Sequence, residues 1–184
     1  MTLRIVLPVA ALAAAALSLG ACATLQRGPV GNAAVPEPAK AVELDRYLGR
    51  WYELARYEAG FQRGCEASTA DYSLREDGLI RVVNSCRQDA VDGPLRTVDG
   101  KARIVEDSGN AKLKVSFFGP FYFGTYWVLD RADDYSWSIV GEPSGRYLWI
   151  LSRDPHPPEA VREALWQRVS DLGYDLSLLR ETRH

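Results

Sequence analysis

Few residues in this sequence are placed to do covalent chemistry. The two histidines are His156, within Asp-Pro-His-Pro-Pro, and His184, and neither stands beside a candidate nucleophile. Asp130, Asp133 and Asp134 lie in one turn, which is more typical of a solvated hairpin tip than of a metal site. The chain lacks the Gly-x-Ser-x-Gly, His-Glu-x-x-His and phosphate-loop motifs. We therefore predict no catalytic centre, no metal site and no cofactor.

The first cysteine is a candidate for lipid attachment. Arg4 is the only charge before an apolar run, Ile5–Leu19, that is shorter than the ~20 residues of a transmembrane helix and fits an export signal. The end of the run, Leu-Gly-Ala-Cys at residues 19–22, resembles the lipobox of bacterial lipoproteins. That resemblance implies a signal peptide over residues 1–21 and an acylated Cys22. The alternative is an ordinary signal peptide followed by an incidental cysteine.

The other two cysteines form an even pair. Export places Cys65 and Cys86 in an oxidising compartment, which favours a disulfide between them. Such a bridge would close a loop of about 20 residues and stabilise the fold by roughly 3 kcal/mol in the loop-entropy model. The alternative is two free, buried thiols.

Composition indicates one globular domain behind a linker. The chain has 184 residues and a net charge of −2, which gives no electrostatic basis for binding nucleic acid. Residues 22–42 are rich in Pro, Gly, Ala and Asn without periodicity, and we expect a lipidated, flexible tether there. The compact domain is expected over residues 43–184, beginning with a short helical turn near Tyr47.

The domain reads as all-β. Eight strand-like runs are separated by short turn motifs, which implies antiparallel neighbours. A meander of this length has unpaired edges unless it closes, so we predict an eight-stranded antiparallel up-and-down barrel with room for one small ligand. The runs cover residues 51–57, 68–75, 79–86, 95–105, 112–118, 124–131, 135–141 and 146–152.

One amphipathic helix is predicted after the last run. It begins with prolines at residues 157 and 158 and ends at Gly173. Val161, Leu165, Val169 and Leu172 share one face, which we expect to pack against the outside of the barrel rather than bind a partner. The residues after Gly173 suit a short final strand.

Several motifs together resemble the lipocalin family. Gly49 and Trp51 form the Gly-x-Trp that opens the first lipocalin strand, Asp134 and Tyr135 occupy the turn between strands six and seven, and Arg153 follows the last strand. The blocks Gly-Arg-Trp-Tyr-Glu-Leu-Ala-Arg-Tyr and Tyr-Leu-Trp-Ile-Leu-Ser-Arg-Asp-Pro are similar to those of bacterial lipocalins related to apolipoprotein D. The resemblance extends from about residue 42 to residue 183.

The resemblance implies a structural role for these signature residues. Trp51 is expected to point into the closed end of the barrel, with the guanidinium of Arg153 lying across its indole face. The same guanidinium is expected to donate to backbone carbonyls between Tyr47 and Gly49.

The resemblance also implies an apolar cavity. A mostly apolar wall with a few hydroxyl and amide groups suits a fatty acid or lysophospholipid, with the acyl chain inside and the head group near the mouth. Alternatives are a barrel filled by its own side chains, an envelope scaffold lipoprotein that binds a protein, or a barrel enzyme acting on lipids. The inward-facing residues are expected to be Tyr72, Val82, Asn84, Leu113, Val115, Phe117, Tyr126 and Trp149.

An aromatic loop and the export signal suggest where the protein works. The loop Phe117–Gly124 is expected at the barrel mouth, touching ligand or membrane; contact between two copies in a homodimer, or a packed loop, are alternatives. Because Ala23 rather than Asp follows Cys22, resemblance to other lipoproteins implies a lipid anchor in the outer membrane, with the domain facing the periplasm. Storage or transport of lipid in the cell envelope is the expected function.

Overall fold

The computed structural model describes residues 28–184. The expected signal peptide over residues 1–21 and the expected lipid attachment at Cys22 lie outside this range. Within the described residues, no helix combines the length and apolar character needed to span a membrane.

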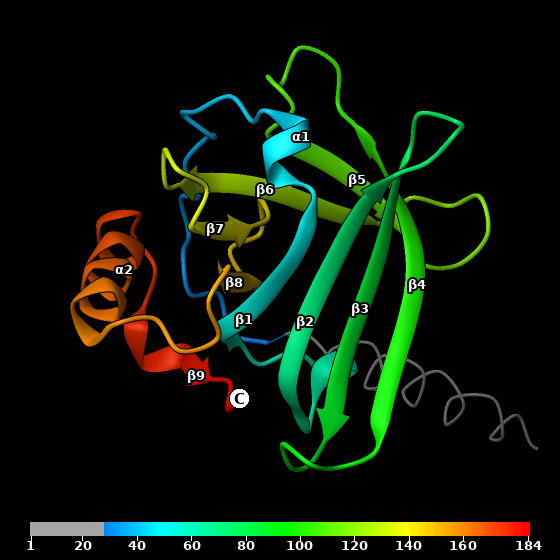
Figure 1. The fold of residues 1–184 in the computed structure, drawn as a ribbon. Coiled ribbons are helices and arrows are strands. Elements are labelled where there is room, and N and C mark those ends of the chain that lie inside the picture. Colours follow the sequence, from blue (N-terminus) through cyan, green and yellow to red (C-terminus); the bar gives the residue numbers. More distant parts are fainter. Residues whose placement is uncertain (1–27) are drawn as a thin grey trace, which may run out of the picture.

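Eight antiparallel strands close into a barrel, which confirms the predicted fold (Figure 1). Each strand pairs with its neighbour in the chain, and β1 closes the circle by pairing with both β2 and β8. All eight strands coincide with the strand-like runs, shifted by a few residues at their ends. The strands are β1 (Gly49–Tyr57), β2 (Cys65–Leu74), β3 (Ile80–Gln88), β4 (Leu95–Ile104), β5 (Lys112–Ser116), β6 (Gly124–Arg131), β7 (Trp137–Gly141) and β8 (Leu148–Ser152).

The two ends of the barrel differ. The short helix α1 (Leu44–Tyr47) lies at one end, which we call the closed end, together with the β2–β3, β4–β5 and β6–β7 loops (Figure 1). The 3₁₀ turn η1 (Gly60–Gln62) lies at the other, open end with the β3–β4, β5–β6 and β7–β8 loops. At this end β4 and β5 separate, because β5 pairs with β4 only from Lys101 onward. Residues 95–100 of β4 are therefore paired with β3 alone.

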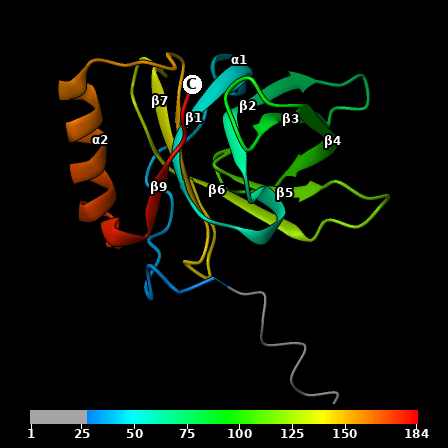
Figure 2. The ribbon, with the colours of Figure 1, turned by 90° about the horizontal axis from the view of Figure 1, so that it is seen from below.

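Helix α2 (Glu159–Asp171) covers one side of the barrel, as Figure 2 shows. Leu165 and Val169 are fully buried against it as expected, but Val161 is 36% exposed, so its predicted burial is wrong. Two steps of four residues turn a helix face by about 80° in all, which carries Val161 to the edge of the stripe. On the helix surface, Val161 and Trp166 lie on the two sides of Val169, and it is Trp166 that packs against the core.

Asp130 was predicted to lie on a solvated hairpin tip, and this is wrong. A β-bulge between Val128 and Asp130 places its side chain under α2, where the residue is only 5% exposed. Its carboxylate accepts a hydrogen bond from Nε of Arg168 at 2.6 Å and lies 3.4 Å from Nζ of Lys40. The carboxylate therefore fastens the helix to the barrel.

The segment before α1 also differs from expectation. Residues 28–42 were expected to belong to a flexible tether, but they run along the barrel with specific contacts. The amide of Gly31 donates to the Gly145 carbonyl at 2.9 Å, Nδ2 of Asn32 donates to the Leu172 carbonyl at 2.9 Å, and Val35 packs against the core. Composition concealed this packing, because it gives no sign of which distant backbone and side-chain groups the segment contacts.

The C-terminal residues are bound to the barrel wall. After the 3₁₀ turn η2 (Leu176–Leu178), the strand β9 (Leu179–Glu181) pairs with β1, as the sequence predicted. The buried carboxylate of Glu66 accepts hydrogen bonds from Arg180 at 2.6 Å and from the backbone and side chain of Arg183 at 2.9–3.2 Å. Burial alone would raise the pKa of Glu66, but these donors outweigh it and hold the pKa below its ordinary value.

The contacts of Glu66 with Arg180 and Arg183 predict that the attachment of the C-terminal residues weakens in acid. Because the folded-state pKa of Glu66 is lowered, its stabilisation is complete above the ordinary value of 4.5 and is lost as the pH falls through the folded value. Glu66→Gln should lower the free energy of unfolding by roughly 1.5–3 kcal/mol at pH 7 and flatten its dependence on pH below 4.5, measured by urea denaturation. Glu181→Gln, at an exposed ion pair with Arg162, is the control and should behave like the wild type. Equal acid sensitivity in all three proteins would contradict this role.

Candidate functional site

The closed end is sealed by a stacked arginine. The guanidinium of Arg153 lies 3.7 Å from the ring centre of Trp51, which is fully buried, as the family resemblance implied. The indole Nε1 donates to the Tyr47 carbonyl at 2.9 Å. The two terminal nitrogens of Arg153 donate at 2.6–3.1 Å to four backbone carbonyls, those of Arg46, Tyr47, Leu48 and Arg50.

The other signature residues shape the same end. Gly49 has a φ of +92°, which an L side chain rarely adopts, and a Cβ there would lie 3.4 Å from Arg153. The hydroxyl of Tyr135 accepts a hydrogen bond from the backbone of Glu43 at 2.8 Å, and Oδ1 of Asp134 accepts one from the amide of Ser136 at 2.9 Å. The Arg153 and Tyr135 contacts tie the entry segment to the last turns of the barrel, whereas the Asp134 contact is internal to the β6–β7 turn.

Inside the barrel is a cavity of about 670 Å³ that reaches the open end. This volume lies within the usual range of roughly 300–1,000 Å³ for small-molecule sites, and it excludes a barrel filled by its own side chains. The structure places all eight sequence-predicted residues on the wall: Tyr72, Val82, Asn84, Leu113, Val115, Phe117, Tyr126 and Trp149. Whether each one touches a ligand remains a prediction.

The floor of the cavity is a row of hydroxyl groups. The Tyr47 hydroxyl lies 2.9 Å from Oγ of Ser138 and 2.8 Å from the Tyr126 hydroxyl, which in turn lies 3.1 Å from that of Tyr72. Burial raises the pKa of Tyr47 to about 12, and it raises the pKa of Tyr72 and of Tyr126 as well. These phenols therefore stay neutral and protonated around pH 7.

The wall near the open end carries polar groups that sequence reasoning missed. Trp149 stacks on Tyr147 at 5.9 Å between ring centres, and its Nε1 donates to Oε1 of Gln62 at 3.0 Å. Glu53 also lines the cavity and is neutralised by the buried Arg56, whose Nη1 donates to its carboxylate at 2.7 Å. Gln62 and Trp149 come from separate segments, η1 and β8, so no local pattern in the sequence marks their contact, whereas Glu53 and Arg56 lie three residues apart on β1.

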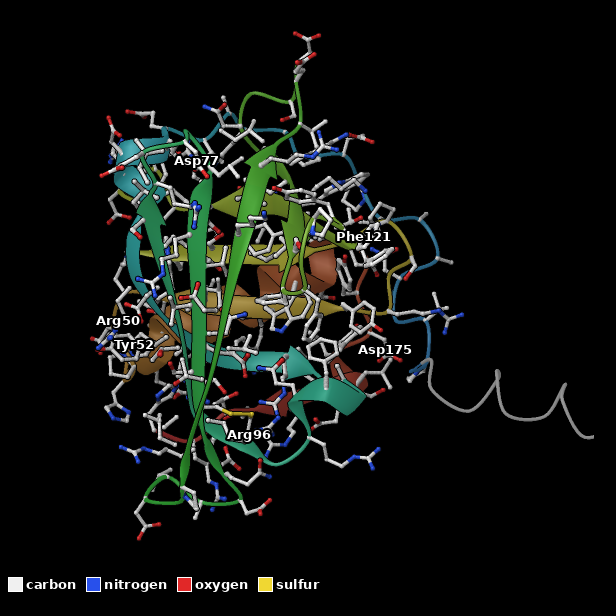
Figure 3. The ribbon with its side chains drawn as sticks, turned by 90° about the vertical axis from the view of Figure 1, so that its right-hand side faces the viewer. Arg50, Tyr52, Asp77, Arg96, Phe121 and Asp175 are labelled. Atoms are coloured by element: carbon white, nitrogen blue, oxygen red, sulfur yellow. A yellow bond between two sulfur atoms is a disulfide. The ribbon has the colours of Figure 1, made fainter. Side chains whose placement is uncertain are left out.

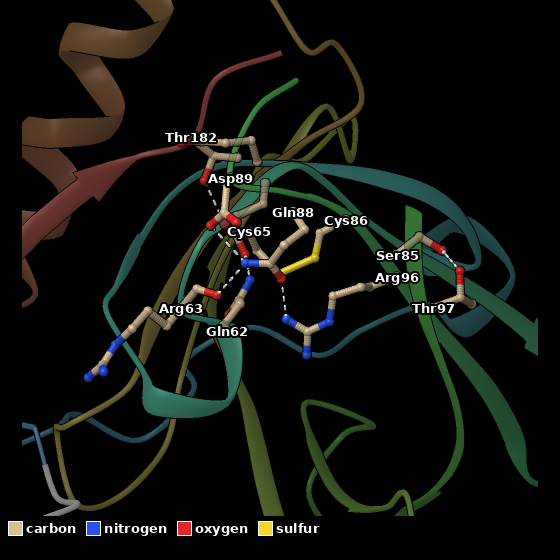
Figure 4. Close-up of a disulfide and its surroundings, with 12 residues drawn as sticks. Gln62, Arg63, Cys65, Ser85, Cys86, Gln88, Asp89, Arg96, Thr97 and Thr182 are labelled. Carbon is tan, nitrogen blue, oxygen red and sulfur yellow. Dashed lines mark hydrogen bonds between the residues drawn. A yellow bond between two sulfur atoms is a disulfide. The ribbon is translucent and has the colours of Figure 1, made fainter. Parts of the chain in front are cut away.

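One cation of the cavity wall has no acidic partner within the described residues. Among residues 28–184, the charged side chains on the wall belong to Glu53, Glu142 and Arg96. Arg96 donates from Nη1 to Oε1 of Gln88 at 2.7 Å and forms no ion pair in this range (Figure 4). Figure 3 places Arg96 toward the end of the long strands opposite Asp77, whose loop belongs to the closed end. The open end thus carries a guanidinium at Arg96 and a carboxylate at Glu142, whose oxygens accept hydrogen bonds from Ser144, Arg146 and Tyr147.

The predicted disulfide between Cys65 and Cys86 is present (Figure 4). Both residues also line the cavity. Cys86, on β3, lies opposite Arg96 on β4. The bridge therefore joins β2 to β3 where the open end needs support.

The aromatic loop between β5 and β6 stands at the mouth. Phe118, Phe121 and Phe123 are 80%, 61% and 84% exposed, which excludes the packed-loop alternative for these three. Phe118 and Phe123 reach the cavity wall, while Phe121 lies on the outside of the barrel (Figure 3). The loop thus presents apolar surface both to the cavity and to the outside of the barrel.

The histidines and acids do not assemble a reactive cluster in this part of the chain. Residues 28–184 hold no group of three His, Cys, Asp or Glu side chains arranged to bind a metal ion. The rings of His156 and His184 lie 6.3 Å apart, and Nε2 of His184 lies 2.8 Å from the Glu53 carbonyl, outside the cavity wall. The arrangement that the structure does provide is a mostly apolar cavity with polar groups at both ends.

Comparison with known proteins agrees with this geometry. The family model described as a lipocalin-like domain matches residues 42–184. The chain belongs to the lipocalin family. It is 39% identical over 166 residues to "Outer membrane lipoprotein Blc" of Vibrio cholerae, covering 89% of this chain and 95% of that protein. It is 36% identical to apolipoprotein D of Rattus norvegicus over 141 residues, covering 72% of each. Insecticyanin from the tobacco hornworm Manduca sexta has the same fold, with a TM-score of 0.67 at 20% identity, covering 86% of this chain and 89% of that one.

The stacked arginine predicts a loss of stability when it is removed. Arg153→Ala removes the cation–π contact and the charge-assisted hydrogen bonds, so the free energy of unfolding should fall by about 2–4 kcal/mol in urea denaturation. Arg103→Ala is the control, because that exposed guanidinium lies 5.2 Å from the ring centre of Tyr122 and should change stability by at most about 0.5 kcal/mol. Equal losses in the two variants would refute the sealing role.

Proposed function

We propose that this lipocalin binds fatty acids or lysophospholipids in its barrel for storage or transport in the cell envelope. The observation that carries the proposal is the cavity of about 670 Å³, apolar along most of its wall, with its unpaired cation, Arg96, toward the open end. An acyl chain fits the wall, and an anionic head group fits beside that guanidinium. The amide of Asn84 offers a further polar contact on the wall.

The energetics allow useful affinity. Each buried methylene contributes about 0.8 kcal/mol, so ~10 of them supply ~8 kcal/mol before the costs of association. A micromolar dissociation constant corresponds to about −8 kcal/mol. A charge interaction at the mouth then offsets part of the association cost.

We further propose that Cys22 carries the lipid anchor and holds the domain at the outer membrane, facing the periplasm. The lipobox-like Leu-Gly-Ala-Cys at residues 19–22 supports this, as does the similarity to proteins named outer membrane lipoprotein. On this view residues 1–21 are removed as the signal peptide, and the lipocalin domain begins near residue 43.

Two other functions compete with lipid binding. An envelope scaffold would use the outer surface to bind a protein, and a lipid enzyme would use the cavity for catalysis. Lipid extraction of the purified protein without its anchor separates them: about one amphiphile per barrel supports carriage, whereas an empty barrel with a tight protein partner supports the scaffold. Turnover of a bound lipid into products would support the enzyme.

Filling the cavity should abolish the binding. Val82 lines the cavity on β3, and Val83, the next residue, does not. Val82→Trp should weaken lysophospholipid binding at least about tenfold by displacing roughly two methylenes of ligand, measured by isothermal titration calorimetry on the protein lacking Cys22. Val83→Trp adds the same bulk outside and should bind within about twofold of the wild type.

The same titrations test the function itself. Failure of the wild-type protein to bind either a fatty acid or a lysophospholipid in the micromolar range would overturn the proposal. Equal affinity of Val82→Trp and the wild type would move the ligand out of the barrel.

The anchor makes a separate prediction. Cys22→Ser in the full chain should shift the protein from the membrane fraction to the soluble periplasmic fraction, because it removes the acceptor of the acyl chains. Cys65→Ser, which breaks the disulfide but leaves Cys22 intact, should stay membrane-bound. Fractionation followed by mass spectrometry of the N-terminal peptide checks both, and an unmodified Cys22 in the wild type would contradict the anchor.

A further inference from the structure

The hydroxyl row on the cavity floor has more hydrogens than partners. Four hydroxyls, those of Ser138, Tyr47, Tyr126 and Tyr72, form a chain with three links. Each hydroxyl carries one hydrogen and each link uses one, so one hydrogen is left without an acceptor inside the chain.

Burial decides where that hydrogen lies. Ser138 is 0% exposed and does not line the cavity, whereas Tyr47 lines it but is only 3% exposed. A buried donor without an acceptor is costly, so both of these hydroxyls must donate along the chain. Ser138 therefore donates to Tyr47, and Tyr47 donates to Tyr126. This direction leaves Tyr126 and Tyr72 to share one link between them.

One tyrosine O–H consequently faces the cavity with no acceptor among residues 28–184. Tyr72 and Tyr126 both line the cavity and are only partly buried, so their free surface points into it. Desolvation raises the pKa of each phenol, so neither loses its proton in the physiological range. The nearby guanidinium of Arg153 is engaged by backbone carbonyls and offers this site no hydrogen bond of its own.

The floor and the mouth therefore offer different polar partners. In the register of the sheet, Tyr72 lies opposite Val82, and Arg96 lies opposite Cys86, four residues further along β3. Four residues of strand correspond to about 13 Å. The cavity thus places a fixed positive charge at one end and a single neutral donor at the other, with an apolar wall between.

We propose that the preferred ligand is an acyl chain with polar groups at both ends: an anionic head group at Arg96 and an uncharged acceptor oxygen, such as a ketone, at Tyr72 and Tyr126. A plain alkyl end at the floor would leave the O–H unpaired. A carboxylate there would be buried against one donor, and this is unfavourable because the terminal nitrogens of the nearby Arg153 already donate to backbone carbonyls. The inference rests on the proposed function, because it assigns the deep end of the same cavity.

The test compares two ligands that differ only at the buried end. Dodecanoic acid and the same acid with a ketone next to its terminal methyl group are titrated by calorimetry into the protein lacking Cys22. One net hydrogen bond predicts about 3–10-fold tighter binding of the keto acid. Infrared spectroscopy of the bound keto acid, labelled at its ketone carbon, should show the C=O stretch shifted to lower frequency.

Variants distinguish this donor from a general polarity effect. Tyr72→Phe should keep most of the preference, because the hydroxyl of Tyr126 then becomes the free donor. The double variant Tyr72→Phe/Tyr126→Phe should reduce the preference to about one, because the hydroxyl then left without an acceptor is that of Tyr47, which is only 3% exposed. Tyr147→Phe, at the open end of the same cavity, is the control and should retain the full preference.

Each outcome bears on a different claim. Equal affinity for the two acids in the wild type, or an unshifted carbonyl stretch, overturns the inference and leaves the proposed function standing. A preference that survives in the double variant also overturns the assignment to these tyrosines. Binding of neither acid overturns the proposed function itself. The infrared measurement needs only the wild-type protein, so it decides the inference even if the double variant fails to fold.

Discussion

The fold depends on a guanidinium held flat against an indole ring. Arg153, which follows the last barrel strand, covers Trp51 in the first strand and satisfies four carbonyls of the entry segment. This contact joins the beginning of the barrel to its end, and one side chain thereby seals the base with its polar atoms paired. Because the base is closed by stacking and hydrogen bonds rather than by core filling, the interior above it can stay hollow.

The cavity is graded in polarity along its length. Its floor consists of neutral hydroxyls, its wall is largely apolar, and its only charges among the described residues lie at Glu53, Glu142 and Arg96. Glu53 is compensated by Arg56, whereas Arg96 faces the site without an acidic partner in the described range. A ligand bound as proposed would have its anionic group at Arg96 and its far end at the floor.

Much of this architecture could be predicted from the sequence because its signals are local. Alternating strands and short turns predicted the barrel and the residues of its wall, and the resemblance of Gly49, Trp51 and Arg153 to the lipocalin signature implied its base. Partners distant in the chain could not be read in the same way: Asp130 looked like a loop residue until α2 covered it. The hydroxyl row likewise draws on four separated segments, and residues 28–42 contact backbone and side-chain groups that lie far away in the chain.

The docking of residues 28–42 sets a limit on how far the barrel can stand from a bilayer. Gly28 lies at the open end, where its carbonyl accepts a hydrogen bond from Arg146 in the β7–β8 loop. Six residue steps separate it from Cys22, and a fully extended chain covers at most about 20 Å over that length. With Cys22 acylated as proposed, the linker to the membrane is short and starts at the open end of the barrel. The open end would therefore stay close to the lipid surface.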